Sequence, residues 1–115
     1  MYVLRIGHKL SDIEVKSIPD TSFATGEYES LRALQEMVGG YIEPCAPVEL
    51  KHRHIELLAN EEGLLTRLPA NENLFPYFYV GTLVAVGIGK EDFCSLTRYQ
   101  IEFLKDWLRG LMKGY

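Results

Sequence analysis

The sequence of 115 residues contains few cysteines and no long apolar run, and both deficits narrow the classes of protein that it can form. Its two cysteines, Cys45 and Cys94, are far apart and lack a CxxC spacing, so we expect free thiols in a reducing compartment. No segment is long enough to span a bilayer, and the first residues alternate in polarity, unlike the apolar centre of a signal peptide. We therefore expect a cytoplasmic protein that does not associate with a membrane.

The sequence also lacks the features that nucleic-acid binding and the common types of catalysis require. Twelve Lys and Arg against sixteen Asp and Glu residues give a formal net charge of −4, whereas proteins that bind duplex phosphates usually carry a basic surface. No serine lies in a Gly-x-Ser-x-Gly motif, and the glycines before Lys90 are followed by Glu91 where a phosphate-binding loop needs Ser or Thr. We expect a non-enzymatic protein that needs no cofactor and does not bind nucleic acid generically.

Apolar periodicity predicts an α+β fold in a single domain over residues 1–115, with two helices on a mostly antiparallel sheet. The first helix ends at Gly39, and the second begins at Thr97, which forms a capping box with Gln100. Hairpins are predicted at the N-terminus and around the turn that contains Asn60 and Gly63, and the run of Gly, Val, Leu and Ala before residue 89 predicts a central strand. The expected elements are strands over 2–6, 13–18, 41–43, 50–59, 64–68 and 80–88, a helix over 27–38 and the C-terminal helix.

The C-terminal helix carries more apolar area than a simple amphipathic stripe. Leu104 and Leu108 belong to the stripe, and Phe103 and Trp107, one turn apart, widen it. Such a face either covers the sheet completely or leaves an aromatic ridge for a partner. We favour a core role for the face and keep Trp107 as a candidate binding residue.

Two histidines offer the arrangement closest to a metal site. His52 and His54 are two residues apart on an expected strand, so both imidazoles would point to one face, with Glu56 or a cysteine as a further ligand. Lys51 and Arg53 alternate with them, however, and cationic neighbours oppose the binding of a metal ion. We expect a solvated strand edge here and no metal.

The order of several short motifs resembles one known family. The motifs are Leu31-x-x-Leu34-Gln35-x-x-Val38-Gly39-Gly40-Tyr41-Ile42-Glu43, then Asn60-Glu61-Glu62-Gly63, Leu68-Pro69-x-Asn71, and Gly81-Thr82 before a valine-rich strand. Together they cover nearly the whole chain and are similar to the domain of unknown function 3846 family. The family occurs in phages, in bacteria and on mobile elements, so the resemblance implies a compact cytoplasmic protein encoded by a phage or mobile element, and it implies no catalytic residues.

These observations lead to two hypotheses about function. The first is an accessory protein of a phage or mobile element that binds a host protein or another host macromolecule and modulates host defence or replication. Its candidate binding residues lie on loops and on the aromatic helix face, where a rigid scaffold presents function: Asn60, Glu61, Glu62, Asn71, Tyr77 and Trp107.

The alternative hypothesis is the capture of a small nucleotide-like ligand at an interface of a homo-oligomer. Aromatic rings stack on planar bases, and tyrosines add a polar end. The interface would be lined by Tyr41, Tyr77, Tyr79 and the loops over 60–71. The net negative charge disfavours an anionic ligand, and a core cluster is the simpler interpretation of the aromatic segment 75–79.

Overall fold

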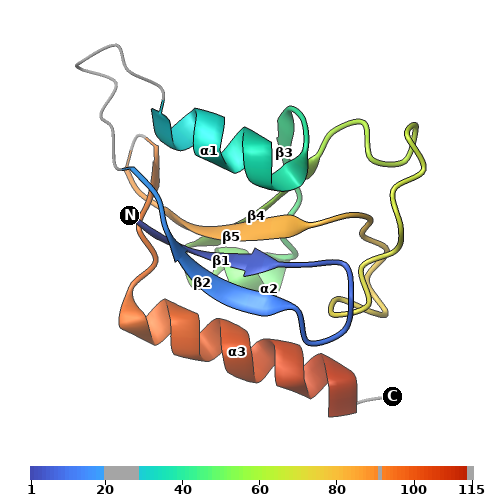
Figure 1. Cartoon of the computed structure of the whole chain (residues 1–115). Coiled ribbons are helices and arrows are strands. Elements are labelled where there is room, and N and C mark those ends of the chain that lie inside the picture. The colour runs from blue at the N-terminus through green and yellow to red at the C-terminus, as the bar shows by residue number, and fades with distance from the viewer. Residues whose placement is uncertain (20–28, 91, 114–115) are drawn as a thin grey trace.

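The computed structural model describes residues 1–19, 29–90 and 92–113, in which a six-stranded antiparallel sheet lies between helices. Figure 1 shows α1 on one face of the sheet and α3 on the other. The α+β fold is confirmed, with one short helix, α2, in addition to the two that the sequence predicts. The elements in chain order are β1 (Tyr2–Ile6), β2 (Ile13–Ser17), α1 (Glu29–Val38), β3 (Ile42–Pro44), α2 (Val48–Lys51), β4 (Ile55–Asn60), β5 (Leu83–Ile88), β6 (Phe93–Cys94) and α3 (Arg98–Lys113).

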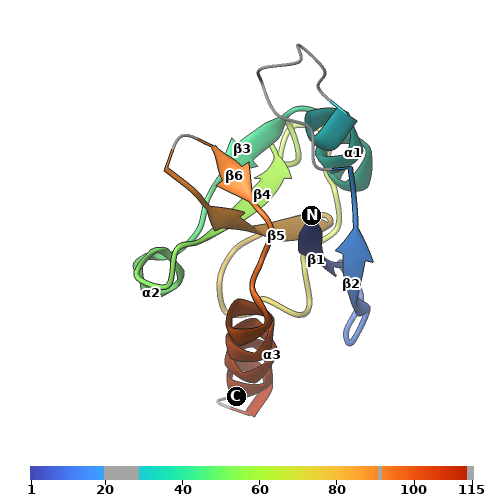
Figure 2. The same cartoon turned by 90° about the vertical axis from the view of Figure 1, so that its left-hand side faces the viewer.

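The sheet has the order β2-β1-β5-β4-β3, and β6 pairs with the end of β5. The central position predicted for the valine-rich strand is confirmed, because β5 lies between β1 and β4 and its residues Leu83 and Val84 are fully buried. The N-terminal hairpin is confirmed as well, with Leu4 of β1 opposite Val15 of β2. As a result, β2 and β3 form the two edges of the sheet, and Figure 2 shows β2 at the rim.

Two hydrophobic clusters hold the helices to the sheet, one on each face. Leu34 of α1 belongs to a cluster with Val3, and Leu104 of α3 belongs to a second cluster with Leu4. Successive side chains of a strand point to opposite faces, so neighbouring residues of β1 contribute to different clusters. The second cluster also contains Leu50 of α2, which places this short helix on the same face as α3.

The ends of both long helices follow the predicted signals. The backbone N–H of Thr97 donates to Oε1 of Gln100 at 2.9 Å, and the N–H of Gln100 donates to Oγ1 of Thr97 at 3.1 Å, so the capping box is confirmed. Nε2 of Gln100 also donates to the carbonyls of Arg53 and His54, which ties the start of α3 to the turn before β4. The α1 helix ends at Gly39, whose φ of +83° favours glycine.

In the second predicted hairpin, the first strand is confirmed from Ile55 onward but is wrong before it. Residues 48–51 form α2, because Pro47, with φ of −67°, stands directly before the helix and favours its start. The chain then turns through His54, which has φ of +57°, and β4 begins only at Ile55. An apolar residue every second or third position thus fits a short helix followed by a strand as well as it fits one long strand.

The second strand of that hairpin is also wrong, since residues 64–68 form turns. Both sides of β4 are occupied, by β3 and by β5, and no side remains for another partner. The backbone N–H groups of Thr66 and Leu68 donate instead to the carbonyls of Glu62 and Gly63. The apolar residues of this segment therefore do not reach the core by strand pairing.

The edge strand β3 carries a proline on its outer side. The N–H of Glu61 donates to the carbonyl of Tyr41, and the N–H of Cys45 donates to the carbonyl of Leu57. Hydrogen-bonding groups alternate in direction along an antiparallel strand, so Pro44 faces away from β4. Proline has no N–H, and this edge therefore lacks a donor at Pro44, as the edge position predicted from the sequence requires.

Candidate functional site

The connection between β4 and β5, residues 61–82, contains or adjoins most of the predicted site residues. Its middle segment, residues 69–74, lies against the hairpin of β1 and β2. The segments on either side, residues 61–68 and 75–80, contain several exposed apolar side chains. These two kinds of segment have different hydrogen bonding and different chemical properties.

Asn71, a predicted binding residue, is buried and holds the backbone together. Only 3% of its surface is exposed, and its Nδ2 donates to the carbonyls of Ile6 at 3.1 Å and Gly81 at 2.9 Å. Its Oδ1 accepts from the backbone N–H of Asn73. The amide is thus fully engaged within the fold, and the expectation that Asn71 is available on a loop for binding is wrong.

Asn73 extends the same network to the turn between β1 and β2. Its Nδ2 donates to the carbonyls of Gly7 at 2.7 Å and Lys9 at 2.8 Å, and its Oδ1 accepts from the N–H of Ser11 at 2.7 Å. Oε2 of the neighbouring Glu72 accepts from the N–H of Leu10. Asn73 could not be predicted from the sequence, because its partners are more than sixty positions away.

Asn60 connects the end of α1 to the start of the connection. Its Nδ2 donates to the carbonyl of Val38 at 3.3 Å, and its Oδ1 accepts from the N–H of Glu62 at 2.9 Å. A side chain at Gly40 would lie 3.0 Å from Nδ2 of Asn60, so glycine permits this close approach. The side chains of Glu61 and Glu62 are exposed, as predicted.

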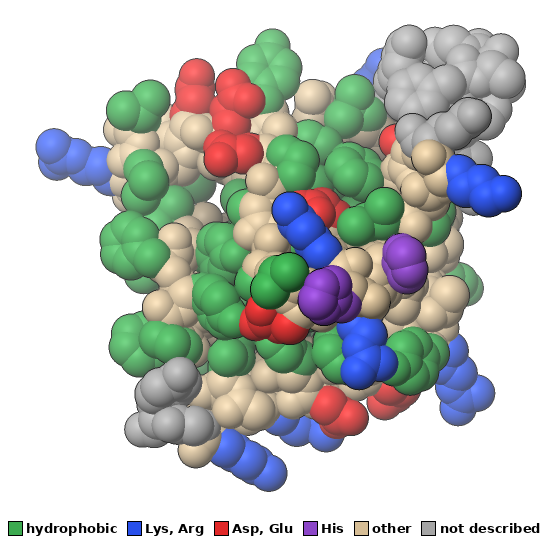
Figure 3. Space-filling model, turned by 180° about the vertical axis from the view of Figure 1, so that it is seen from behind, with side chains coloured by type: hydrophobic (Ala, Val, Ile, Leu, Met, Phe, Trp, Pro, Cys, Tyr) green, Lys and Arg blue, Asp and Glu red, His purple; other side chains and the backbone are tan. Residues whose placement is uncertain are grey.

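Large apolar side chains surround a hollow of about 210 Å³ beside the edge strand β3. Leu64 and Phe78 line this hollow and are 67% and 83% exposed, and the adjacent Leu65 is 85% exposed. Seen from behind, hydrophobic side chains gather along the side of the molecule that this connection forms, with acidic side chains above them (Figure 3). We call the hollow, its acidic rim of Glu43 and Glu61 and the side chains of Leu64, Leu65 and Phe78 the loop surface.

The floor of this hollow is electrically neutral. Burial, reinforced by the negative charges of Glu56 and Glu43, raises the pKa of the Cys45 thiol to about 12. The hydroxyl of Tyr79 donates to the carbonyl of Cys45 at 2.6 Å, and burial raises the pKa of this phenol as well. Both groups stay protonated at neutral pH, so the floor offers an apolar surface without a reactive thiolate.

The structure brings two of the predicted binding residues, Tyr77 and Trp107, together. Their ring centroids are 5.7 Å apart, and the hydroxyl of Tyr77 donates to the carboxylate of Glu49, which lowers the pKa of that carboxyl. Trp107 is partly buried and packs against the cluster beneath α3. Tyr77 also stacks on Tyr79, whereas Tyr41 lines another hollow with Asn60.

The two histidines do not have the geometry on which the metal alternative depended. His52 ends α2 with φ of −63°, and His54 lies in the following turn, so neither is on a strand. Both are exposed. Within the described ranges, no group of three or more His, Cys, Asp or Glu side chains is arranged to hold a metal ion.

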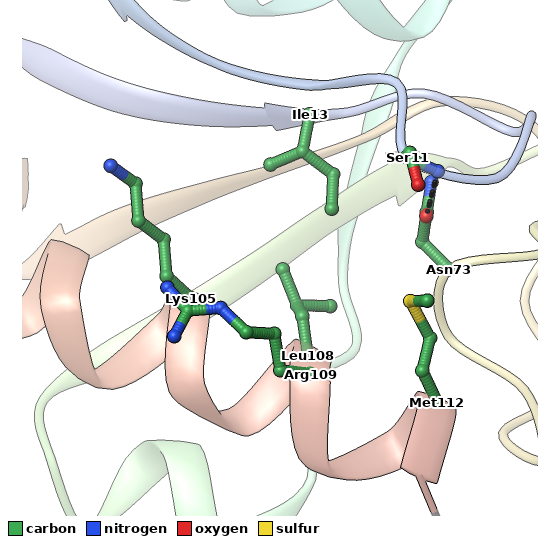
Figure 4. A pocket seen from close by; sticks show the side chains of 7 residues that line it. All are labelled: Ser11, Ile13, Asn73, Lys105, Leu108, Arg109 and Met112. Carbon is green, nitrogen blue, oxygen red and sulfur yellow. Dashed lines mark hydrogen bonds between the residues drawn. The ribbon is translucent and has the colours of Figure 1, made fainter.

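A further hollow, of about 350 Å³, lies between the β1–β2 turn and the second half of α3. Figure 4 shows Ile13 of β2 and Leu108 of α3 pointing toward each other across it, with Met112 at one end. Lys105 and Arg109 also line it, and Arg109 is paired with Asp106 at 3.0 Å. This hollow could not be predicted from the sequence, because the turn and the helix are far apart along the chain.

The fold and the site define a small α+β protein with a buried polar network on one side of its long connection and an apolar hollow on the other. The chain belongs to the family described as Domain of unknown function (DUF3846), whose model matches residues 1–109. No curated protein and no solved structure matches the chain. In the described part of the chain, no helix combines the length and the apolar character needed to cross a membrane.

Proposed function

We propose that the protein is a non-enzymatic accessory protein that binds a host protein through the loop surface. The observation that carries this proposal is the exposure of Leu64 and Phe78, which line a single hollow, together with that of Leu65, which follows Leu64 in the chain. Contiguous apolar patches of this kind mark interaction sites on proteins that are otherwise well packed. A large apolar side chain that fills such a hollow is the usual anchor of a protein interface.

The charges around the hollow indicate the chemistry of the partner. The floor is neutral, whereas Glu43, Glu61 and the nearby Glu62 are acidic, and the whole chain has a net charge of −4. A partner segment with one aromatic or aliphatic side chain and flanking Lys or Arg residues complements this surface. The protonated state of Cys45 supports binding rather than nucleophilic catalysis here.

The biological setting is a further part of this proposal and is suggested by the resemblance described above. The protein would act in the cytoplasm of a host cell as a product of a phage or mobile element and would modulate host defence or replication. Tyr77 and Trp107 contribute indirectly in this proposal, because they pack together between α2 and α3. Glu61 contributes directly at the rim of the hollow, and Glu62 contributes its exposed charge from the next position in the chain.

A display library of short random peptides tests the binding surface and does not require the host partner to be identified first. We expect selected peptides to share an apolar anchor beside Lys or Arg. The double substitution Leu65→Ser with Phe78→Ser should weaken their binding at least about tenfold, because anchors and their pockets dominate interface energies. Calorimetry with one selected peptide measures the change.

Phe75 provides the matched control, because it is also an exposed phenylalanine of the connection but lines a different hollow. Phe75→Ser should leave the peptide affinity unchanged. A second test replaces Glu61 and Glu62 by Gln, which should weaken binding and reduce its dependence on salt. Equal affinity for the wild type and the Leu65, Phe78 double variant would disprove the loop surface as the binding site.

A further inference from the structure

The outer edge of β2 presents backbone groups that β1 does not use. At one end of the hairpin the N–H of Gly7 donates to the carbonyl of Asp12, and at the other end the N–H of Ile18 donates to the carbonyl of Met1. Because hydrogen-bonded and non-hydrogen-bonded pairs alternate in an antiparallel ladder, the residues of β2 between these ends alternate in direction. Glu14 and Lys16 therefore bond to β1, whereas the backbone groups of residues 13, 15 and 17 face outward.

Among the described residues, β1 is the only strand that pairs with β2. Figure 2 shows the strand at the rim, with α1 and α3 on the two faces of the sheet and neither beyond the edge. The strand contains no proline, and its residues from Glu14 to Ser17 are exposed. Edge strands of this kind are templates for pairing with another strand, and proteins that remain monomeric usually block them.

We propose that β2 pairs with β2 of a second copy of this chain in antiparallel orientation, centred on Val15. The sequence of the strand, Ile13-Glu14-Val15-Lys16-Ser17, is complementary to itself in this register. Glu14 stands opposite the partner's Lys16, and by symmetry Lys16 stands opposite the partner's Glu14. Opposite charges at directly opposed positions stabilise a strand pair, whereas like charges destabilise it.

The outward backbone groups complete the pairing in the same register. The N–H of Val15 donates to the carbonyl of the partner's Val15, and the reverse bond forms by symmetry. The N–H of Ser17 donates to the carbonyl of the partner's Ile13. The N–H of Ile13 already donates to the carbonyl of Ser11 within the chain, so it needs no partner at the interface.

The side chains are placed for this contact. Val15 lies opposite Leu4 of β1 and thus on the α3 face, where its 39% exposed side chain would meet the partner's Val15. On the other face, Glu14 and Lys16 are about half exposed. Oε1 of Glu14 lies 3.5 Å from both the Arg5 guanidinium and Nζ of Lys16, and pairing adds a cation from the second copy. The interface does not include the loop surface, which adjoins the opposite edge strand β3.

Exchange of the two charges tests the register. Glu14→Lys gives two cations per strand and Lys16→Glu gives two anions, so each variant alone should self-associate at least about tenfold more weakly than the wild type. An equimolar mixture of the two variants should form a heterodimer, because every opposed pair then has opposite charges. Analytical ultracentrifugation over a concentration series measures all three samples, and circular dichroism confirms that each variant is folded.

A backbone test uses the outward N–H of Val15. Val15→Pro removes this donor without removing a bond to β1 and should abolish the dimer, whereas the control Val15→Thr keeps the donor and should retain it. A wild-type chain that stays monomeric at every concentration would overturn the proposal. So would a dimer that Val15→Pro or the separate charge variants leave intact, because that dimer would form through another surface.

Discussion

In the connection between β4 and β5, the middle segment buries polar side chains, whereas the flanking segments expose apolar side chains. In the middle segment, the polar residues Asn71 and Asn73 are 3% and 2% exposed, and their side-chain amides bond to backbone groups. In the flanking segments, Leu65 and Phe78 are the two most exposed large apolar side chains of the described residues, at 85% and 83%. One connection therefore buries amides and exposes hydrocarbon.

The buried amides of the middle segment serve the stability of the fold, whereas the exposed apolar side chains are available for an interface. Backbone groups at the end of β1 and in the turn before β2 need partners when they are covered, and the amides of residues 71 and 73 supply them. The exposed side chains of Leu65 and Phe78 do not supply such hydrogen bonds, so we expect their replacement by polar residues to change the stability little. Substitutions in the two kinds of segment should therefore affect different measurements.

The largest expected effect belongs to Asn71→Ala. The substitution leaves the buried carbonyls of Ile6 and Gly81 and the N–H of Asn73 without their partner, so the free energy of unfolding should fall by about 2–4 kcal/mol. Urea denaturation measures it. The neighbouring control Glu72→Ala, which loses one exposed hydrogen bond, should cost less than about 1 kcal/mol. Equal effects of the two substitutions would contradict the structural role of Asn71.

Gly81→Ala should have the next largest effect. Gly81 has φ of +73°, and an added Cβ would lie 2.8 Å from Cδ1 of Leu68, so we expect a loss of about 1–3 kcal/mol. Gly110 in α3 is the control, because no atom lies within 4 Å of its added Cβ. Gly110→Ala should stabilise the protein by about 0.5–1 kcal/mol, and thermal unfolding of both variants compares the two signs. If Gly81→Ala stabilised the protein, a side chain at position 81 would be compatible with this backbone conformation, and the prediction would be wrong.

A smaller effect on stability is expected from the ion pair between Arg5 and Asp12 in the β1–β2 hairpin. The hydrogen bond from Arg5 to Asp12, at 3.0 Å, holds the pKa of Asp12 below its ordinary value. The folded state thus binds this proton less readily than the unfolded state, so the pair stabilises the fold above the unfolded pKa and is lost as the pH falls through the lowered value. Asp12→Asn should therefore make the free energy of unfolding depend less on pH in the acid range.

Denaturation at a series of pH values measures this prediction. Glu49, whose pKa is lowered by the hydrogen bond from Tyr77, contributes in the same direction, so Tyr77→Phe is the control that removes the second contribution. Each of the two substitutions alone should reduce the slope of the free energy of unfolding against pH in the acid range. An unchanged slope in Asp12→Asn would mean that Asp12 has the same pKa in both states.

The smallest effect on stability should come from the exposed side of the connection. Leu65→Ser removes an apolar side chain that is 85% exposed, so the free energy of unfolding should change by less than about 0.5 kcal/mol. The same substitution, with Phe78→Ser, is expected to abolish most of the peptide binding described above. A stability loss above about 1 kcal/mol would show that Leu65 packs into the fold.

Much of the fold could be predicted from the sequence, because several signals are local. The β1–β2 hairpin follows from alternation, β5 from a continuous apolar run, and α3 from the capping box of Thr97 and Gln100. Each of these signals depends on residues that are close in sequence. The strand predicted over 64–68 is wrong because the pairing of β4 is decided elsewhere in the chain, by β3 and β5, which occupy its two sides.

The candidate site could be predicted only in part, for the same physical reason. Glu61 and Glu62 are exposed in a turn as expected, since a turn tolerates polar residues independently of the rest of the chain. Asn71 looks identical in sequence to an exposed loop asparagine, and only the arrival of β1 beside it determines that it is buried. Leu64 and Leu65 are likewise exposed because β3 and β5 already occupy both sides of β4, so their segment cannot pair with it as a strand.

Pro44 on the outer side of β3 has a consequence for the size of any assembly. The sheet has two edges, and the missing donor at Pro44 disfavours strand addition at one of them. In the proposed dimer, association through the other edge is isologous, because β2 meets an identical strand, and a two-fold axis uses up that edge in both copies. Such an assembly would stop at two chains, because further growth of the sheet would need the edge that Pro44 disfavours.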